Sequence, residues 1–329
     1  MDDSRLSIPV KYKAIFEREI ATPANDLFRS YDPVTNTHTF QAHSHNCDNC
    51  STTGCSADCH KKLGELMWKN LVFYCYGEDE IVDKINSGLF SNLTLASRTA
   101  YNERLPKRDP KKDGVPGEVL LDMLVQLHQP NAYKLAVRHL LRQNDNNEIK
   151  GYDLTYFASE NGQISIWLGQ AKMGERDYCL NGIHRDLTAK FKDTYLSKQI
   201  FFIADKQIGT TLEAKEITTA ICKLNELSAR ESKSDQKRAT ALIQHFNNNG
   251  ISIVIPCLLA YGKGTIYSDI SKVKEAIEDE LKLIQAYYQR KTYTFDNFAP
   301  QIVFYVFPLK DLGKLRMEGF YAGLYQHTS

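Results

Sequence analysis

The most regular pattern of apolar and polar positions lies between residues 117 and 204. In its first and fifth segments apolar residues return at helical spacing, whereas the segments between them alternate or run apolar over short lengths, as strands do. The predicted elements are, in order, a helix at 117–128, strands at 133–141, 152–160 and 163–172, a helix at 186–199 and a strand at 200–204. This order, α-β-β-β-α-β, predicts an α/β domain built on a mixed sheet.

Helices and strands continue to alternate toward the C-terminus. The pattern there predicts helices near 212–230 and 270–290, and strands at 251–260 and 301–308. Before the main pattern, the segment 101–117 is rich in proline, lysine and arginine, which predicts a loop. We therefore place a domain boundary in this loop, with an N-terminal region at 1–110 and the α/β domain at 111–329.

The pair Asn161-Gly162 lies between two strand-like segments and predicts a tight hairpin turn. Such a turn fixes the register, because each step back along one strand then matches a step forward along the other. Asp153 is thereby placed directly opposite Gln170, with Cβ atoms about 4.5–5.5 Å apart. Lys172 lies two residues beyond Gln170 and shares its face of the sheet.

This group of side chains suits a magnesium site. A hard divalent cation prefers oxygen ligands; Asp153 and Gln170 offer a carboxylate and an amide oxygen, and Glu118 on the preceding helix could complete the set. A metal ion lowers the pKa of its bound water and holds a phosphate oxygen, while Lys172 would orient or help deprotonate that water, or neutralise charge on the phosphate. An Asp and a Lys on a hairpin also form surface ion pairs in many proteins, and that alternative stays open.

At these residues the chain resembles the PD-(D/E)xK nuclease superfamily. Its core is α-β-β-β-α-β, with a glutamate on the first helix, an aspartate on the second strand and (D/E/Q)-x-K on the third. Glu118, Asp153 and Gln170-Ala171-Lys172 follow that order, so the resemblance implies catalytic roles for them in Mg²⁺-dependent cleavage of DNA. Gln170 stands where glutamate is commoner, which removes one negative charge and favours weaker metal binding.

More narrowly, the segment 110–310 resembles the HamA family, the nuclease subunits of the Hachiman anti-phage defence system. The motifs that carry this resemblance are Gly117-Glu118-Val119-Leu120-Leu121, Gly151-Tyr152-Asp153 and Trp167-Leu168-Gly169-Gln170-Ala171-Lys172. The resemblance implies a partner, a large superfamily 2 helicase called HamB. It also implies that DNA degradation begins when the helicase senses phage or damaged DNA.

Charge changes this interpretation in one respect. The formal net charge is +1, so a DNA-binding surface has to come from local clusters of basic residues. The basic residues that follow the Lys172 strand and could contact DNA phosphates are Arg176, Arg185, Lys190 and Lys192. The alternative is that they form a solvated helix face.

Four cysteines with the spacing C-x2-C-x4-C-x3-C form a separate candidate site. They are Cys47, Cys50, Cys55 and Cys59. Four thiolates this close can surround one ion, so we expect a structural Zn²⁺ with a closed ligand set. An iron–sulfur cluster is the second candidate, and thiols without a metal are the third.

The chain begins without a signal peptide pattern, and no apolar run reaches the roughly 18 residues that a membrane span needs. We therefore expect a cytoplasmic protein with no membrane contact.

The leading hypothesis for function is a metal-dependent DNA endonuclease, the effector subunit of a helicase–nuclease complex. The uncharged Gln170 keeps a rival open, a non-catalytic regulatory subunit that binds and restrains the helicase on DNA. A third hypothesis is a zinc-dependent nucleic-acid binder whose nuclease core has lost activity.

Overall fold

The computed structural model describes ten segments of the chain: residues 28–31, 38–42, 44, 57–90, 93–106, 108–129, 132–135, 151–206, 212–295 and 297–325. The described strands form one seven-stranded sheet in the order β1-β2-β7-β6-β5-β4-β3. Their bounds are β1 Phe28–Tyr31, β2 His38–Ala42, β3 Ala132–Lys134, β4 Leu154–Glu160, β5 Gln163–Gly174, β6 Ile251–Gly262 and β7 Gln301–Leu309. The centre from β2 to β5 is parallel and both margins are antiparallel, so the sheet is mixed.

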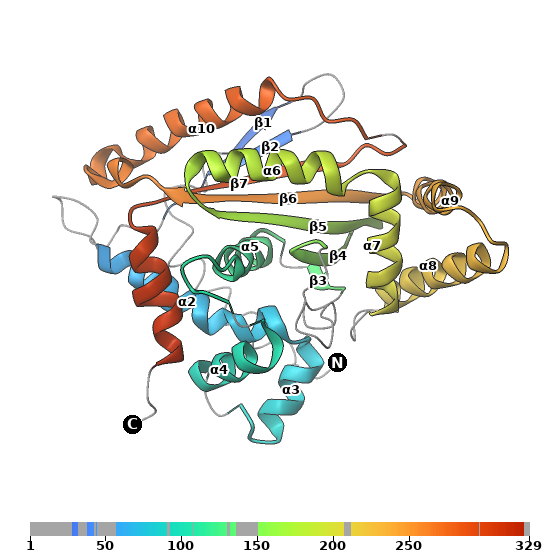
Figure 1. Ribbon diagram of the computed structural model, residues 1–329, viewed down its shortest axis with the longest axis horizontal. Helices are drawn as coiled ribbons and strands as arrows, with labels where there is room; N and C mark the ends of the chain where they lie inside the picture. The colour runs from blue at the N-terminus through green and yellow to red at the C-terminus, as the bar shows by residue number, and fades with distance from the viewer. Residues whose placement is uncertain are drawn as a thin grey trace.

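Helices cover both faces of this sheet (Figure 1). One face, here called the α5 face, carries α2 Ala57–Cys75, α4 Leu93–Arg104 and α5 Val115–His128 over one apolar core. The other, the α6 face, carries a second core beneath α6 Arg176–Lys190 and α10 Val273–Gln289. The remaining helices are α3 Glu78–Asn86, α7 Asp193–Asp205, α8 Leu212–Arg230 and α9 Asp235–Asn248, with short 3-10 or π segments at Gly264–Tyr267, Ile270–Lys272, Lys314–Phe320 and Tyr321–Leu324.

The predicted mixed α/β architecture is confirmed. The helix at 117–128 and the strands at 152–160, 163–172, 251–260 and 301–308 correspond to α5, β4, β5, β6 and β7. The loop predicted at 101–117 is shorter in the structure, because α4 continues to Arg104 and α5 begins at Val115. Of the predicted strand at 133–141 the structure describes only its first residues, in β3, since 136–150 lie outside the described part of the chain.

Two predictions around residue 200 are wrong. The apolar run 200–204 lies inside helix α7, and the single helix predicted at 186–199 is two helices, α6 and α7, that meet at Phe191 and Lys192. Side chains of the run, such as Ile200 and Ile203, pack into the α6-face core. The strand that follows α6 in the sheet is β6, which pairs in parallel with β5.

The hairpin between β4 and β5 has the predicted turn and register. Asn161 and Gly162 both have positive φ, 51° and 77°, which matches the turn type that Asn-Gly pairs favour. Glu160 faces Gln163, and the pairing continues without a slip to Leu154 opposite Gly169.

In the part of the chain that the structure describes, no helix combines the length and apolar character needed to cross a membrane.

Candidate functional site

The candidate site lies where β5 runs past the end of β4. The pairing of the two strands ends at Leu154, while β5 continues to Gly174. Asp153, the residue before β4, bonds to β5 at this point: its backbone N–H donates to the Gly169 carbonyl at 2.9 Å, and its Oδ2 accepts from the Ala171 N–H at 2.8 Å. The Asp153 carboxylate is thereby fixed against the backbone beside Gln170, where the predicted register places it.

Gln170 and Lys172 both point to the α6 face. Gln170 is fully buried, and its Nε2 donates to the Gly169 carbonyl at 2.7 Å. The stem of Lys172 crosses helix α6 at Gly182, where a Cβ atom would stand 3.0 Å from Lys172 Cδ and Cε. A glycine at this position of α6 therefore lets the lysine run across the helix backbone.

Asp186 on α6 completes the group, and sequence reasoning missed it. Its Oδ2 accepts from Lys172 Nζ at 2.5 Å and lies 3.4 Å from Lys190 Nζ, one helical turn further on. Lys190 Nζ also donates to Gln170 Oε1 at 2.5 Å. We call Asp153, Gln170, Lys172, Asp186 and Lys190 the α6 cluster. The sequence feature that could have identified Asp186 is its spacing of four from Lys190, which places both residues on one helix face.

Lys172 keeps its positive charge in this environment. Burial lowers the pKa of Lys172, but the nearby carboxylates of Asp153 and Asp186 raise it, and the net direction is upward. An ammonium that stays protonated is suited to neutralising charge and orienting a water molecule, and it is a poor base.

Glu118 reaches the same end of the sheet from the opposite face. Helix α5 lies on β5 with Gly117 against Ala171 and Met173, so Glu118 is level with the end of β5 that carries Gln170. The Glu118 carboxylate is buried and accepts a hydrogen bond from the Tyr74 hydroxyl. Glu118 therefore lies on the opposite face of the sheet from Gln170 and Lys172. To share a metal ion with them, its carboxylate would have to reach past the edge of β5 beyond Leu154, where the pairing with β4 has ended.

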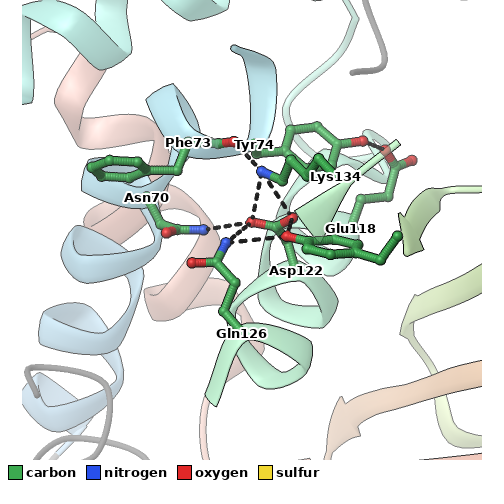
Figure 2. Close-up of polar contacts among 8 residues, drawn as sticks. Asn70, Phe73, Tyr74, Glu118, Asp122, Gln126 and Lys134 are labelled. Carbon is green, nitrogen blue, oxygen red and sulfur yellow. Dashed lines mark hydrogen bonds and ion pairs between the residues drawn. The ribbon is translucent and has the colours of Figure 1, made fainter. Parts of the chain in front are cut away.

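A second polar cluster lies on the α5 face, around Asp122 (Figure 2). The carboxylate is 1% exposed. It accepts from Asn70 Nδ2 at 3.2 Å, Gln126 Nε2 at 2.6 Å and the Tyr156 hydroxyl at 2.7 Å, and it pairs with Lys134 Nζ at 3.1 Å. We call these five residues the Asp122 cluster. Its members come from α2, α5, β3 and β4, and Lys134 also donates to the Phe73 carbonyl, so the cluster ties four elements together.

The oxygen atoms of the α6 cluster suit a hard cation. Asp153, Gln170 and Asp186 supply side-chain oxygens, and the Gly151 carbonyl lies 3.2 Å from Lys190 Nζ. The Lys190 ammonium already lies among three of these oxygens, those of Gln170, Gly151 and Asp186. In the segments that the structure describes, no three His, Cys, Asp or Glu side chains are grouped so as to hold a metal, so a metal here would depend on the amide and carbonyl oxygens.

The cysteine site stays a prediction. Cys47, Cys50 and Cys55 lie outside the described residues, and Cys59 is half-buried near the start of α2. Its neighbour His60 is fully buried, and His60 Nε2 accepts from the Lys310 N–H at 2.9 Å.

The four basic residues predicted to contact DNA have different surroundings. Arg176 pairs with the buried Glu280 at 2.7 Å, and Lys190 belongs to the α6 cluster. Arg185 and Lys192 are exposed. In the structure as it stands, two of the four therefore present their charge to solvent and two bond within the protein.

Comparison with known proteins gives one result that concerns the whole chain. A search of the curated proteins finds no match. The model of the HamA family matches residues 27–324, nearly the full length and both polar clusters. The chain belongs to the HamA family.

Proposed function

We propose that the chain is a metal-dependent DNA endonuclease whose active site is the α6 cluster. Membership of the HamA family implies a component of the Hachiman defence system. The observation that carries the finer proposal is the convergence of Asp153, Gln170 and Lys172 at the open end of β5, in the register of a (D/E/Q)-x-K site. The order α5-β3-β4-β5-α6, with β6 as the next strand after helices α7 to α9, supports a PD-(D/E)xK core.

The residues divide the chemistry between them. Asp153 and Gln170 would hold a Mg²⁺ ion, with Glu118 as a further ligand from the other side of the strand edge. Such an ion supplies a water of lowered pKa and a clamp on a phosphate oxygen. Lys172, held by Asp186, presents a fixed positive charge to the phosphate as negative charge builds on it.

The proposed partner is a superfamily 2 helicase of the HamB type. Two observations support it besides the family: the formal net charge is only +1, and two of the four expected DNA-contacting cations are engaged within the protein. A nuclease with little free positive charge gains from a partner that brings it to DNA.

A second candidate is a non-catalytic subunit that binds the helicase and restrains it. One observation favours it: Gln170 carries no charge, and its Oε1 accepts a hydrogen bond from Lys190. In that case the α6 cluster is an internal ion-pair network without a metal.

The test is cleavage of plasmid DNA by the complex of this protein with its helicase, in Mg²⁺ and ATP. We expect Lys172→Ala and Asp153→Ala each to reduce cleavage by about 10²-fold or more, and EDTA to abolish it. Lys282→Ala, an exposed lysine on α10 that pairs with the exposed Asp279, is the matched control and should cleave normally. Equal cleavage by the two site variants and the control would move the chemistry elsewhere, whereas no cleavage by any complex would favour the regulatory subunit.

A further inference from the structure

The ammonium of Lys190 lies among the oxygen atoms that a metal in the α6 cluster would need. It donates to Gln170 Oε1 at 2.5 Å and to the Gly151 carbonyl at 3.2 Å, and it lies 3.4 Å from Asp186 Oδ2. Two of the three hydrogens of the ammonium therefore bond to oxygens of the site, and the Asp186 carboxylate faces it as an ion-pair partner. Lys190 is thus a resident cation of the site.

A metal and this ammonium compete for Gln170. The amide has one oxygen, and a divalent ion bound to it would stand close to a second positive charge in surroundings where burial weakens the screening. Gln170 is fully buried and its Nε2 is bonded to Gly169, so the side chain is not free to turn its one oxygen away from Lys190. Metal binding through Gln170 therefore requires Lys190 to move.

The surroundings of Lys190 point to the anion that would receive it. Its side chain is 21% exposed and stands in the last turn of α6, next to the exposed Lys192. Asp186 cannot hold it alone, because its carboxylate already pairs with Lys172 at 2.5 Å. An anion from outside, arriving beside the exposed Lys192 as well, would bind the ammonium more strongly, and a nucleic-acid phosphate fits this surface.

We propose that Lys190 couples metal binding to nucleic-acid binding. In the free protein it holds the oxygens of Gln170 and Gly151, and when a backbone phosphate takes its ammonium, these oxygens pass to the metal. The inference rests on the proposed function, because it takes the α6 cluster as the nuclease site. By linkage, DNA then tightens metal binding and the metal tightens DNA binding by the same factor.

The experiment measures Mn²⁺ affinity of the purified full-length protein by electron paramagnetic resonance of the free ion, with and without a saturating short DNA duplex. Mn²⁺ accepts the same oxygen ligands as Mg²⁺, and a gel run after each titration checks that the duplex is intact. The variants are Lys190→Met, which keeps the apolar stem, Lys190→Arg, which keeps the charge, and Lys282→Met as the control, an exposed lysine on α10 outside the predicted DNA-contacting set. Circular dichroism confirms that each variant is folded.

For the wild type and Lys282→Met we expect the duplex to tighten Mn²⁺ binding by at least about fivefold. Lys190→Met should bind Mn²⁺ more tightly without DNA, by about the same factor, and should lose the effect of the duplex; Lys190→Arg should retain part of it. An equal effect of the duplex in folded Lys190→Met would overturn the coupling and leave the nuclease proposal standing. Absence of Mn²⁺ binding in every variant would overturn both.

Discussion

The two polar clusters lie on opposite faces of one sheet, and each joins lysine to a buried aspartate, yet they differ in how completely they are closed. Asp122 is 1% exposed, and a single carboxylate receives three neutral donors and one ammonium. In the α6 cluster Asp186 is 11% exposed and faces two lysines. A closed network of this kind fixes elements in place, whereas a set of charges at an open strand end can exchange partners.

The clusters also differ in where their members come from. The Asp122 cluster takes one or two side chains from each of α2, α5, β3 and β4, so every bond to Asp122 except the one from Gln126, also on α5, crosses between elements. The α6 cluster lies at one end of β5 and along one face of α6. Loss of a charge should therefore disturb the fold in the first cluster and the chemistry in the second.

The largest effect on stability is expected for Asp122→Ala. Removal of the carboxylate leaves the Lys134 ammonium and three neutral donors without their acceptor in a buried place, which should lower the free energy of unfolding by about 3–5 kcal/mol. Urea unfolding followed by circular dichroism measures this. Asp186→Ala is the matched change in the other cluster, and there we expect a loss of about 1–2 kcal/mol. An equal loss in both variants would contradict the distinction between a closed and an open cluster.

A matched pair of lysine variants sharpens the comparison with a smaller effect. Lys134→Met leaves the charge of Asp122 with neutral donors only, which should lower the free energy of unfolding by about 2–3 kcal/mol. Lys172→Met leaves Asp186 next to Lys190, so the loss should stay within about 1 kcal/mol. DNA cleavage by the helicase complex should show the reverse order, falling sharply for Lys172→Met and little for Lys134→Met once the protein is folded. Parallel losses of stability and cleavage in both variants would argue against separate roles.

Sequence patterns predicted the parts of the molecule that depend on local rules. The Asn161-Gly162 turn fixed the hairpin register and so placed Asp153 beside the strand of Gln170 and Lys172. The periodicity of α5 and the apolar runs of β6 and β7 gave those elements within a few residues. Each of these rests on spacing along the chain, which a single sequence contains.

The sequence analysis was wrong or incomplete for features that depend on how helices and strands pack against one another. The run 200–204 is apolar throughout because α7 is buried, and a short apolar run fits a buried strand or a buried helix equally well. Asp186 was missed, and the bond of Lys190 to Gln170 was not foreseen, because no sequence rule states that α6 lies over the end of β5. The polar cluster around Asp122 was missed for the same reason, since its five members come from four elements.

The finest test of the α6 cluster changes no charge at all. Gly182→Ala puts a Cβ atom 3.0 Å from Lys172 Cδ and Cε, which are close to the flexible end of the side chain, so the lysine can move aside at little cost in stability. The added methyl also favours the helix over glycine by up to about 1 kcal/mol, and the free energy of unfolding should change by less than about 0.5 kcal/mol. The displaced ammonium should nevertheless lower DNA cleavage by about tenfold, because misplacement of a fixed charge by a fraction of an ångström weakens its stabilisation of the transition state.

The control for this variant is Gly88→Ala, at a glycine between α3 and α4 with nothing within 4 Å of the added Cβ. It should cleave normally even if its positive φ costs some stability. Full cleavage by a stable Gly182→Ala protein would mean that the position of Lys172 against α6 does not matter to the reaction, and the α6 cluster would then be as purely structural as the one around Asp122.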